Sequence, residues 1–205
     1  MKNYPAAPLI YETCLIINET ERNMNGKNIK AGVFVEKMYE DLEFWYPYLR
    51  LKEAGIEPDV IAPKKGEYAG KHGLVATATI ASDAAVGKTY DLIVVPGGYS
   101  PDHMRRDKNM IEIVRRHGQA NRTLAVICHG PWMLVSAGLA KGRRLTSFFS
   151  IKDDLIAAGA NWIDEGVVRD GNLITAQSPD DLPRLMPVVL DAIGISSAQP
   201  VGAAR

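Results

Sequence analysis

The sequence has only two cysteines, Cys14 and Cys128, among its 205 residues. Two cysteines cannot build a cysteine-rich zinc site, and small secreted domains that depend on disulfides use more of them. We therefore expect no disulfide framework, no metal and no cofactor, and we expect Cys128 to be a reduced thiol.

The chain also lacks net charge and long hydrophobic runs. Lys plus Arg equals Asp plus Glu, at 24 each, so no overall field attracts nucleic acid or an anionic membrane. The longest apolar run near the N-terminus, Leu15–Ile17, is too short for a signal sequence or a membrane span. We predict a cytoplasmic protein with one main domain that binds neither nucleic acid nor membrane.

Hydrophobic periodicity alternates between buried strands and amphipathic helices along most of the chain. This alternation is typical of an α/β protein with a mostly parallel sheet between helices. We place this domain at residues 29–195, after an N-terminal extension over 1–28 and before a flexible tail over 196–205. The expected strands are 29–35, 59–62, 74–79, 91–95 and 124–127, and the expected helices are 41–54, the stretch around 110–117 and 182–193.

Turn and capping signals add detail to the second half of the chain. Asp170-Gly171 between two apolar pairs is a hairpin signal. Two segments, Ser150–Asp153 and Ser178–Asp181, resemble the capping boxes that begin helices, with Asp in place of the usual Glu.

The segment around Cys128 has the pattern of a nucleophile elbow, a reactive side chain on a sharp turn between a strand and a helix. An apolar run over 124–127 precedes it, and a helix-like stretch follows it. Gly130 permits a tight turn, and Pro131 suits the first helical position, where no N–H is needed. Because positive charge at a helix N-terminus favours a thiolate, we predict that Cys128 is a nucleophile, ionised at neutral pH.

No histidine follows the elbow helix. The four histidines are His72, His103, His117 and His129. Enzymes of the α/β-hydrolase type and papain-like proteases place their histidine after the nucleophile, so both classes lack their base here. The proton acceptor for Cys128 must be His129, an upstream histidine or a carboxylate.

Two loops at the carboxyl ends of predicted strands can supply the other groups, because ligands bind at this edge of a parallel sheet. Acids follow the first strand: Glu36, Glu40 and Asp41. The loop after the strand at 91–95 contains Asp102 and His103, preceded by Gly97 and Gly98. The N–H groups of these glycines, together with that of His129, can form an oxyanion hole.

Several short motifs occur in a fixed order and spacing over residues 30–193. They are Tyr39–Glu43, Tyr46–Tyr48, Arg50–Glu53, Gly70–Gly73, Pro96–Gly98, Ile127–Pro131, Ile151–Asp154 and Val168–Gly171. Together they resemble the ThiJ/PfpI family, specifically its PfpI-type intracellular protease and deglycase branch. The resemblance implies a flavodoxin-like α/β/α sandwich with the cysteine on the elbow. It also implies a homo-oligomer, either a dimer or a hexamer.

The resemblance implies roles for three site residues besides Cys128. An acid, here Glu40, hydrogen-bonds the sulfur, and repulsion beside a thiolate keeps that acid protonated. A carboxylate from a neighbouring subunit orients His129, and the matching position is Asp102, one methylene shorter than the usual Glu. Glu43 is interpreted as a helix-surface residue. For His129 itself, we favour a role through its backbone N–H.

Three functions remain open at this point. The resemblance implies a cysteine-dependent, stress-protective enzyme that acts on reactive carbonyls or their adducts, like a glyoxalase III or a protein deglycase. A second candidate is an intracellular cysteine peptidase or amidase with His129 as base. A third is a redox stress sensor or chaperone without catalysis, in which oxidation of Cys128 is the signal. The expected partner of the enzyme is a small aldehyde or a glycated protein or peptide.

Overall fold

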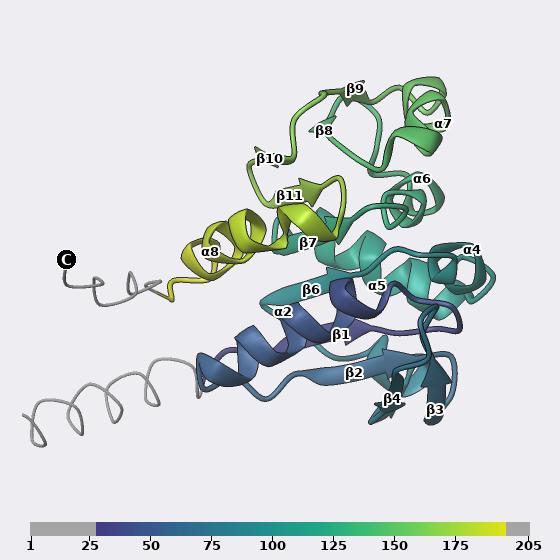
Figure 1. Ribbon diagram of the computed structural model, residues 1–205, viewed down its shortest axis with the longest axis vertical. Coiled ribbons are helices and arrows are strands. Elements are labelled where there is room, and N and C mark those ends of the chain that lie inside the picture. Colours follow the sequence, from purple (N-terminus) through teal and green to yellow (C-terminus); the bar gives the residue numbers. More distant parts are fainter. Residues whose placement is uncertain (1–27, 196–205) are drawn as a thin grey trace, which may run out of the picture.

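The computed structural model describes residues 28–195, so the predicted extension and tail lie outside it apart from Asn28. Its centre is a seven-stranded sheet in the order β10-β11-β7-β6-β1-β2-β5 (Figure 1). All neighbouring strands pair in parallel except β10 and β11, which are antiparallel. The strands are β1 (Ala31–Phe34), β2 (Asp59–Ala62), β5 (Ile80–Ala81), β6 (Leu92–Val95), β7 (Thr123–Ile127), β10 (Val167–Asp170) and β11 (Leu173–Ala176).

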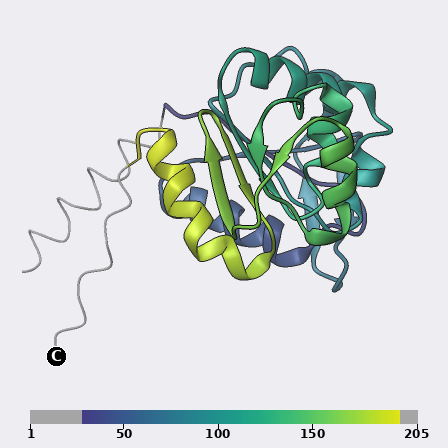
Figure 2. The same cartoon turned by 90° about the horizontal axis from the view of Figure 1, so that it is seen from above.

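Helices cover both faces of the sheet, which gives three layers (Figure 2). The helices α2 (Asp41–Glu53) and α8 (Leu182–Ala192) pack on one face. The opposite face is covered by α3 (Ser82–Ala85), α4 (Ser100–Met104), α5 (Lys108–Gln119), α6 (Trp132–Ala137) and α7 (Lys152–Ala157).

Side chains of the central strands alternate between the two cores. Val33 belongs to the core beneath α2 and α8, and the adjacent Phe34 belongs to the core on the other face. This alternation follows from the two-residue period of a strand. The predicted α/β/α sandwich with a mostly parallel sheet is confirmed.

One predicted strand does not join the main sheet. The strand expected over 74–79 is present as β4 (Val75–Ala78), but it pairs antiparallel with β3 (Gly66–Ala69) in a separate hairpin. Val75 is 48% exposed whereas Ala76 and Ala78 are buried. The segment therefore has the alternation of a half-exposed hairpin rather than the continuous burial of a parallel strand. A further short pair, β8 (Arg144–Leu145) with β9 (Asn161–Trp162), was not anticipated.

The two predicted capping boxes differ from expectation. The helix α7 begins at Lys152 after a 3-10 turn, η1 (Phe149–Ile151), and its N-cap is Ile151 without a side-chain cap. Ser150 therefore lies inside η1, and its hydroxyl contacts His129 instead. At the second segment, the Ser178 hydroxyl donates to the Asp181 carboxylate at 3.0 Å before a second 3-10 turn, η2 (Pro179–Asp181).

Candidate active site

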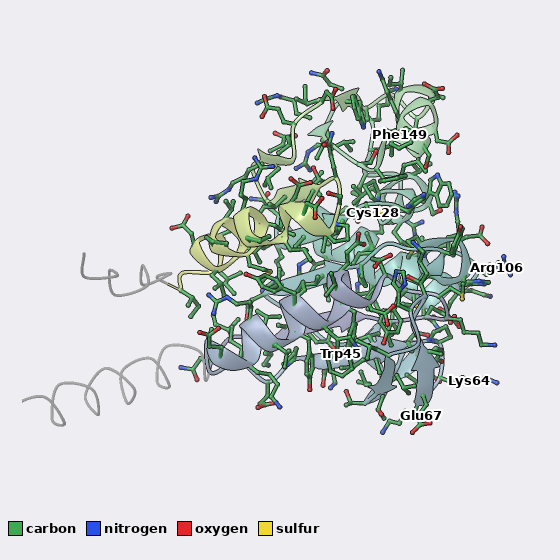
Figure 3. The ribbon with its side chains drawn as sticks, in the orientation of Figure 1. Trp45, Lys64, Glu67, Arg106, Cys128 and Phe149 are labelled. Carbon is green, nitrogen blue, oxygen red and sulfur yellow. The ribbon has the colours of Figure 1, made fainter. Side chains whose placement is uncertain are left out.

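Cys128 lies on a strained turn at the carboxyl end of β7. Its φ is +59°, in the left-handed region that residues other than Gly, Asn and Asp seldom adopt. Such a conformation costs about 1–3 kcal/mol and is typical of functional positions. The Cys128 N–H donates to Ala176 O at 2.9 Å, and its carbonyl accepts the Phe148 N–H at 2.9 Å. The predicted nucleophile elbow is present, and Figure 3 labels Cys128 at this position.

Gly130 makes the sharp turn possible. A Cβ at this position would lie 2.8 Å from both Ile127 O and Val95 O, closer than real contacts allow. Its N–H donates to Ile127 O at 2.7 Å and closes the turn. The backbone can therefore pass close to the ends of β6 and β7 only with glycine at this position.

The acid beside the sulfur is Glu43, and the assignment of this role to Glu40 is wrong. Glu43 is fully buried, with an exposed fraction of 0%, whereas the sequence interpretation placed it on the helix surface. Its carboxyl lies within hydrogen-bonding reach of the Cys128 sulfur. The Gly97 N–H donates to Glu43 Oε2 at 2.7 Å, which fixes the carboxyl in this position.

Glu40 instead points to the rim of the site. It is the N-cap residue of α2, with an extended backbone (φ −72°, ψ 118°), while Glu43 lies one turn into the helix. This backbone directs the Glu40 carboxylate to Lys71 Nζ at 3.1 Å and to His72 Nε2 at 3.3 Å. Glu40 and Glu43 thus have different surroundings because Glu40 precedes the first helical residue whereas Glu43 lies within α2.

The protonation state of Glu43 follows from its burial. Burial raises the pKa of Glu43 to about 8, against the opposing effect of the Gly97 N–H. Among the described residues no group donates to its Oε1. A buried carboxyl oxygen without a donor is best satisfied when it carries the proton itself. With its pKa at about 8, Glu43 is therefore mostly a neutral acid at neutral pH.

The predicted low pKa of the thiol is contradicted. Burial raises the pKa of Cys128 well above its ordinary value, and the charge of an ionised Glu43 raises it further. Only the Gly98 and His129 N–H groups, which point at the sulfur, oppose this shift. The side chain is 7% exposed, so the loss of solvation outweighs the attraction of these dipoles. Burial at this position therefore favours the thiol over the thiolate.

His129 contacts the sulfur through its imidazole ring as well as through its backbone N–H. Its Nδ1 lies 3.1 Å from Cys128 Sγ, and its Nε2 lies 3.1 Å from Ser150 Oγ. Phe148 stacks on the imidazole with ring centroids 5.2 Å apart, and Trp132 meets it edge-on at 5.4 Å. Burial, and then the charge of Lys71, lower the pKa of His129. The imidazole is therefore neutral at neutral pH and can accept a proton.

The predicted oxyanion hole is only partly available. The Gly97 N–H is committed to Glu43, whereas the Gly98 and His129 N–H groups face the sulfur. Gly98 has φ +69°, and a Cβ would lie 2.5 Å from Met38 O. Gly97 serves close packing instead, because its Cβ would lie 2.7 Å from Cys128 Cβ.

The tip of the β3–β4 hairpin, residues 70–74, forms the rim of the site beside Glu40. The buried Asp41 carboxylate accepts the N–H groups of His72 and Leu74, both at 2.8 Å. The Lys71 N–H donates to Tyr39 O at 2.8 Å. These bonds hold the Lys71 ammonium at the rim, where its charge lowers the pKa of Glu43 and of His129.

The remaining predicted site residues lie apart from the sulfur. Asp102 is on α4, half-exposed, and pairs with Arg106, which lies two residues beyond the end of that helix. Its role beside His129 of a neighbouring subunit stays a prediction. His117 is buried with Nε2 2.7 Å from Thr123 O, and burial lowers its pKa to about 4. Sequence reasoning missed Ser150 and the aromatic contact of Phe148, because neither is near Cys128 in the sequence.

Two further observations concern the described part of the chain as a whole. Over residues 28–195 no group of His, Cys, Asp or Glu side chains is arranged to hold a metal ion. A hollow of about 630 Å³ lies at the opposite edge of the sheet, lined by residues that include Lys30, Asp59 and Tyr90. It is remote from Cys128, so it is not the place where a substrate of the sulfur binds.

The fold and the turn define a class of α/β sandwich proteins that carry a cysteine on a nucleophile elbow. The sequence profile of the DJ-1/PfpI family matches residues 29–192, and the chain belongs to this family. No helix within the described range has the length and apolar composition needed to cross a membrane.

Two curated relatives have names that state an activity. "Deglycase PfpI" of Pyrococcus furiosus is 42% identical over 144 residues, which cover 70% of this chain and 87% of the relative. A protein of Thermococcus kodakarensis, also named a deglycase, is 41% identical over 144 residues with the same coverage.

Solved structures agree with the fold. A protein of Anabaena variabilis with DJ-1/ThiJ/PfpI-like and ferritin-like domains superimposes with a TM-score of 0.82 and 36% identity. The match covers 84% of this chain and 50% of that protein, so the chain spans half of its length. DJ-1beta of Drosophila melanogaster has a TM-score of 0.75 and 25% identity, covering 81% of this chain and 91% of the other.

Proposed function

We propose that this protein is a cysteine-dependent hydrolase that removes early carbonyl adducts from amines and thiols and hydrates the free 2-oxoaldehyde by the same chemistry. The deglycase names of relatives about 40% identical support the substrate class. The observation that carries the proposal is the position of the Cys128 sulfur, 3.1 Å from a neutral imidazole and beside a protonated carboxyl. This arrangement supplies a nucleophile, a base and an acid at one carbon.

The first step is addition of sulfur to the aldehyde carbon. His129 Nδ1 takes the thiol proton as Sγ attacks, and Glu43 gives its proton to the carbonyl oxygen. The product is a hemithioacetal, with an imidazolium and a carboxylate left on the protein. With a glycated amine, sulfur replaces the amine on the same carbon and the amine leaves with a proton. The Gly98 and His129 N–H groups stabilise the negative charge that develops on sulfur and then on oxygen.

The second step moves hydrogen from one substrate carbon to the next. The Glu43 carboxylate removes the proton on the sulfur-bearing carbon while the imidazolium protonates the adjacent ketone oxygen, giving an enediol. Glu43 then returns its proton to the second carbon, and His129 takes the proton of the first hydroxyl. The first carbon is oxidised to a thioester and the second is reduced to a secondary alcohol, so no external oxidant is needed.

Hydrolysis of the thioester completes the cycle. Water attacks the thioester carbon and gives a proton to the Glu43 carboxylate, and the departing sulfur is protonated by His129. The products from methylglyoxal are lactic acid and the original thiol, with one water consumed. Both Glu43 and His129 return to their resting protonation states.

The test compares Cys128→Ala, Glu43→Gln and the matched Glu40→Gln. The substrates are methylglyoxal, a preformed methylglyoxal adduct of an amine freed of excess aldehyde, and a peptide. We expect no turnover of the first two by Cys128→Ala and a loss of at least about a hundredfold for Glu43→Gln, because the amide cannot accept a proton. Glu40→Gln, at the rim, should lose far less.

Release of amine and formation of lactate are measured separately at catalytic amounts of protein. The two measurements distinguish direct hydrolysis of the adduct by the protein from consumption of free aldehyde after the adduct has dissociated spontaneously. Wild-type turnover by Cys128→Ala would refute the proposal. Cleavage of the peptide alone would favour the peptidase, which the 3.1 Å contact between Sγ and Nδ1 also permits.

A further inference from the structure

Ser150 is a residue whose predicted role and observed contact differ. Its place in the sequence resembles a helix N-cap, yet α7 begins two residues later and Ile151 is its N-cap. The Ser150 hydroxyl lies 3.1 Å from Nε2 of His129, on the side of the imidazole away from the sulfur. The imidazole of His129 thus contacts Cys128 Sγ through Nδ1 and Ser150 Oγ through Nε2, both at 3.1 Å.

Hydrogen bonds and a ring stack connect residues 147–148, which lie just before Ser150, to the turn that carries Cys128. The Phe148 N–H donates to Cys128 O at 2.9 Å, and its ring stacks on the imidazole. Ser147 accepts the Trp162 indole N–H at 3.0 Å and donates to Phe148 O at 2.9 Å. The position of the Ser150 hydroxyl relative to His129 is therefore set by the same contacts that hold the turn. In Figure 3 the neighbouring Phe149 is labelled near α7, beyond the turn with Cys128.

The contact between Ser150 and His129 affects which imidazole nitrogen carries the hydrogen. A neutral imidazole carries one hydrogen, on either Nδ1 or Nε2. To take the thiol proton, Nδ1 must be bare, so the hydrogen must be on Nε2. An acceptor at Nε2 favours that tautomer, and the bond strengthens when the ring becomes an imidazolium, because its donor is then charged.

We propose that Ser150 is a positioning residue that accepts the Nε2 hydrogen of His129 and thereby keeps Nδ1 free to take the Cys128 proton. The proposal rests on the proposed function for its effect on turnover. Its effect on the tautomer and on thiol reactivity does not depend on the substrate. The orienting hydroxyl comes from the same chain as His129.

The test uses Ser150→Ala, the conservative Ser150→Thr, and Asp102→Asn as the competing orienting group. Thr89→Ala removes an exposed hydroxyl elsewhere as a control. The readouts are the nitrogen-15 shifts of labelled His129, the rate of iodoacetamide alkylation between pH 5 and 9, and kcat and KM for methylglyoxal. Thermal unfolding checks that each variant is folded.

We expect Ser150→Ala to reduce the Nε2–H tautomer, to slow alkylation at neutral pH by about fivefold and to lower kcat similarly with KM unchanged. Ser150→Thr should restore all three, and Thr89→Ala should resemble wild type. Wild-type tautomer and alkylation in Ser150→Ala would overturn the proposal, as would the same changes in Asp102→Asn alone. If Cys128→Ala remains active, the proposed function fails, but the tautomer and alkylation data still decide the role of Ser150.

Discussion

Substitution of Glu43 by Gln should change how the stability of this protein depends on pH. Burial raises the pKa of Glu43 from 4.5 to about 8. The folded state then holds a proton that the unfolded chain releases near pH 4.5. A carboxyl with a raised pKa stabilises the fold fully below the unfolded value, and this contribution is lost as pH rises toward the folded value.

The size of the effect follows from the two pKa values. At about 1.36 kcal/mol for each tenfold change in proton affinity, a rise from 4.5 to about 8 amounts to about 5 kcal/mol over the whole range. Between pH 5 and pH 7.5 the wild-type free energy of unfolding should fall by about 3 kcal/mol relative to that of Glu43→Gln. Gln is neutral at every pH, so it lacks this dependence.

Urea unfolding followed by tryptophan fluorescence, at steps of half a pH unit, measures the difference. Other titrating groups cancel when the variant is subtracted from wild type. Cys128→Ala should keep the wild-type slope, because burial rather than the sulfur is the largest cause of the shift in the pKa of Glu43. Parallel curves for wild type and Glu43→Gln would show that the buried carboxyl ionises as in the unfolded chain, and the argument for a neutral acid would be lost.

Two further substitutions test how the site is assembled. Gly97→Ala places a methyl group 2.7 Å from Cys128 Cβ and 2.8 Å from His129 N, so we expect about 1–3 kcal/mol lower stability and loss of most activity. Gly87→Ala, with nothing within 4 Å, should be nearly neutral in the same unfolding experiment, and equal losses in both would contradict the packing argument. Asp41→Ala removes the acceptor of two backbone N–H groups, so hydrogen exchange at His72 and Leu74 should quicken by at least about tenfold. Unchanged protection there would show that Asp41 does not hold the hairpin tip.

Local pattern predicted most of the scaffold. The helix expected over 41–54 occupies Asp41–Glu53, and the strand expected over 91–95 occupies Leu92–Val95. Both rest on periodicity and on turn residues that act within a few positions. The strand expected over 74–79 is present as Val75–Ala78, but its place in a separate hairpin was not predicted, because period-2 alternation does not say which strand will be the partner.

Local sequence pattern could not predict which glutamate is the acid beside Cys128. Glu40 and Glu43 are the same residue type, three positions apart in one motif. Which of them meets the sulfur depends on where α2 begins and how it crosses the end of β6. The Gly97 N–H then holds the Glu43 carboxyl in place by donating a hydrogen bond to it. Its protonation depends on burial, which is a property of the packed molecule.

The amino-acid sequence alone determined the alternating sandwich and the carboxyl end of β7 as the place of Cys128, because strand, glycine and proline signals act over a few neighbouring residues. Only the tertiary structure decided the charge state of that sulfur and the identity of its partners. Desolvation and the approach of Glu43, His129 and Ser150 arise when distant segments pack around one turn. The sequence predicted a lowered thiol pKa because the helix dipole is a local feature, whereas the desolvation that raises this pKa appears only when the chain is packed.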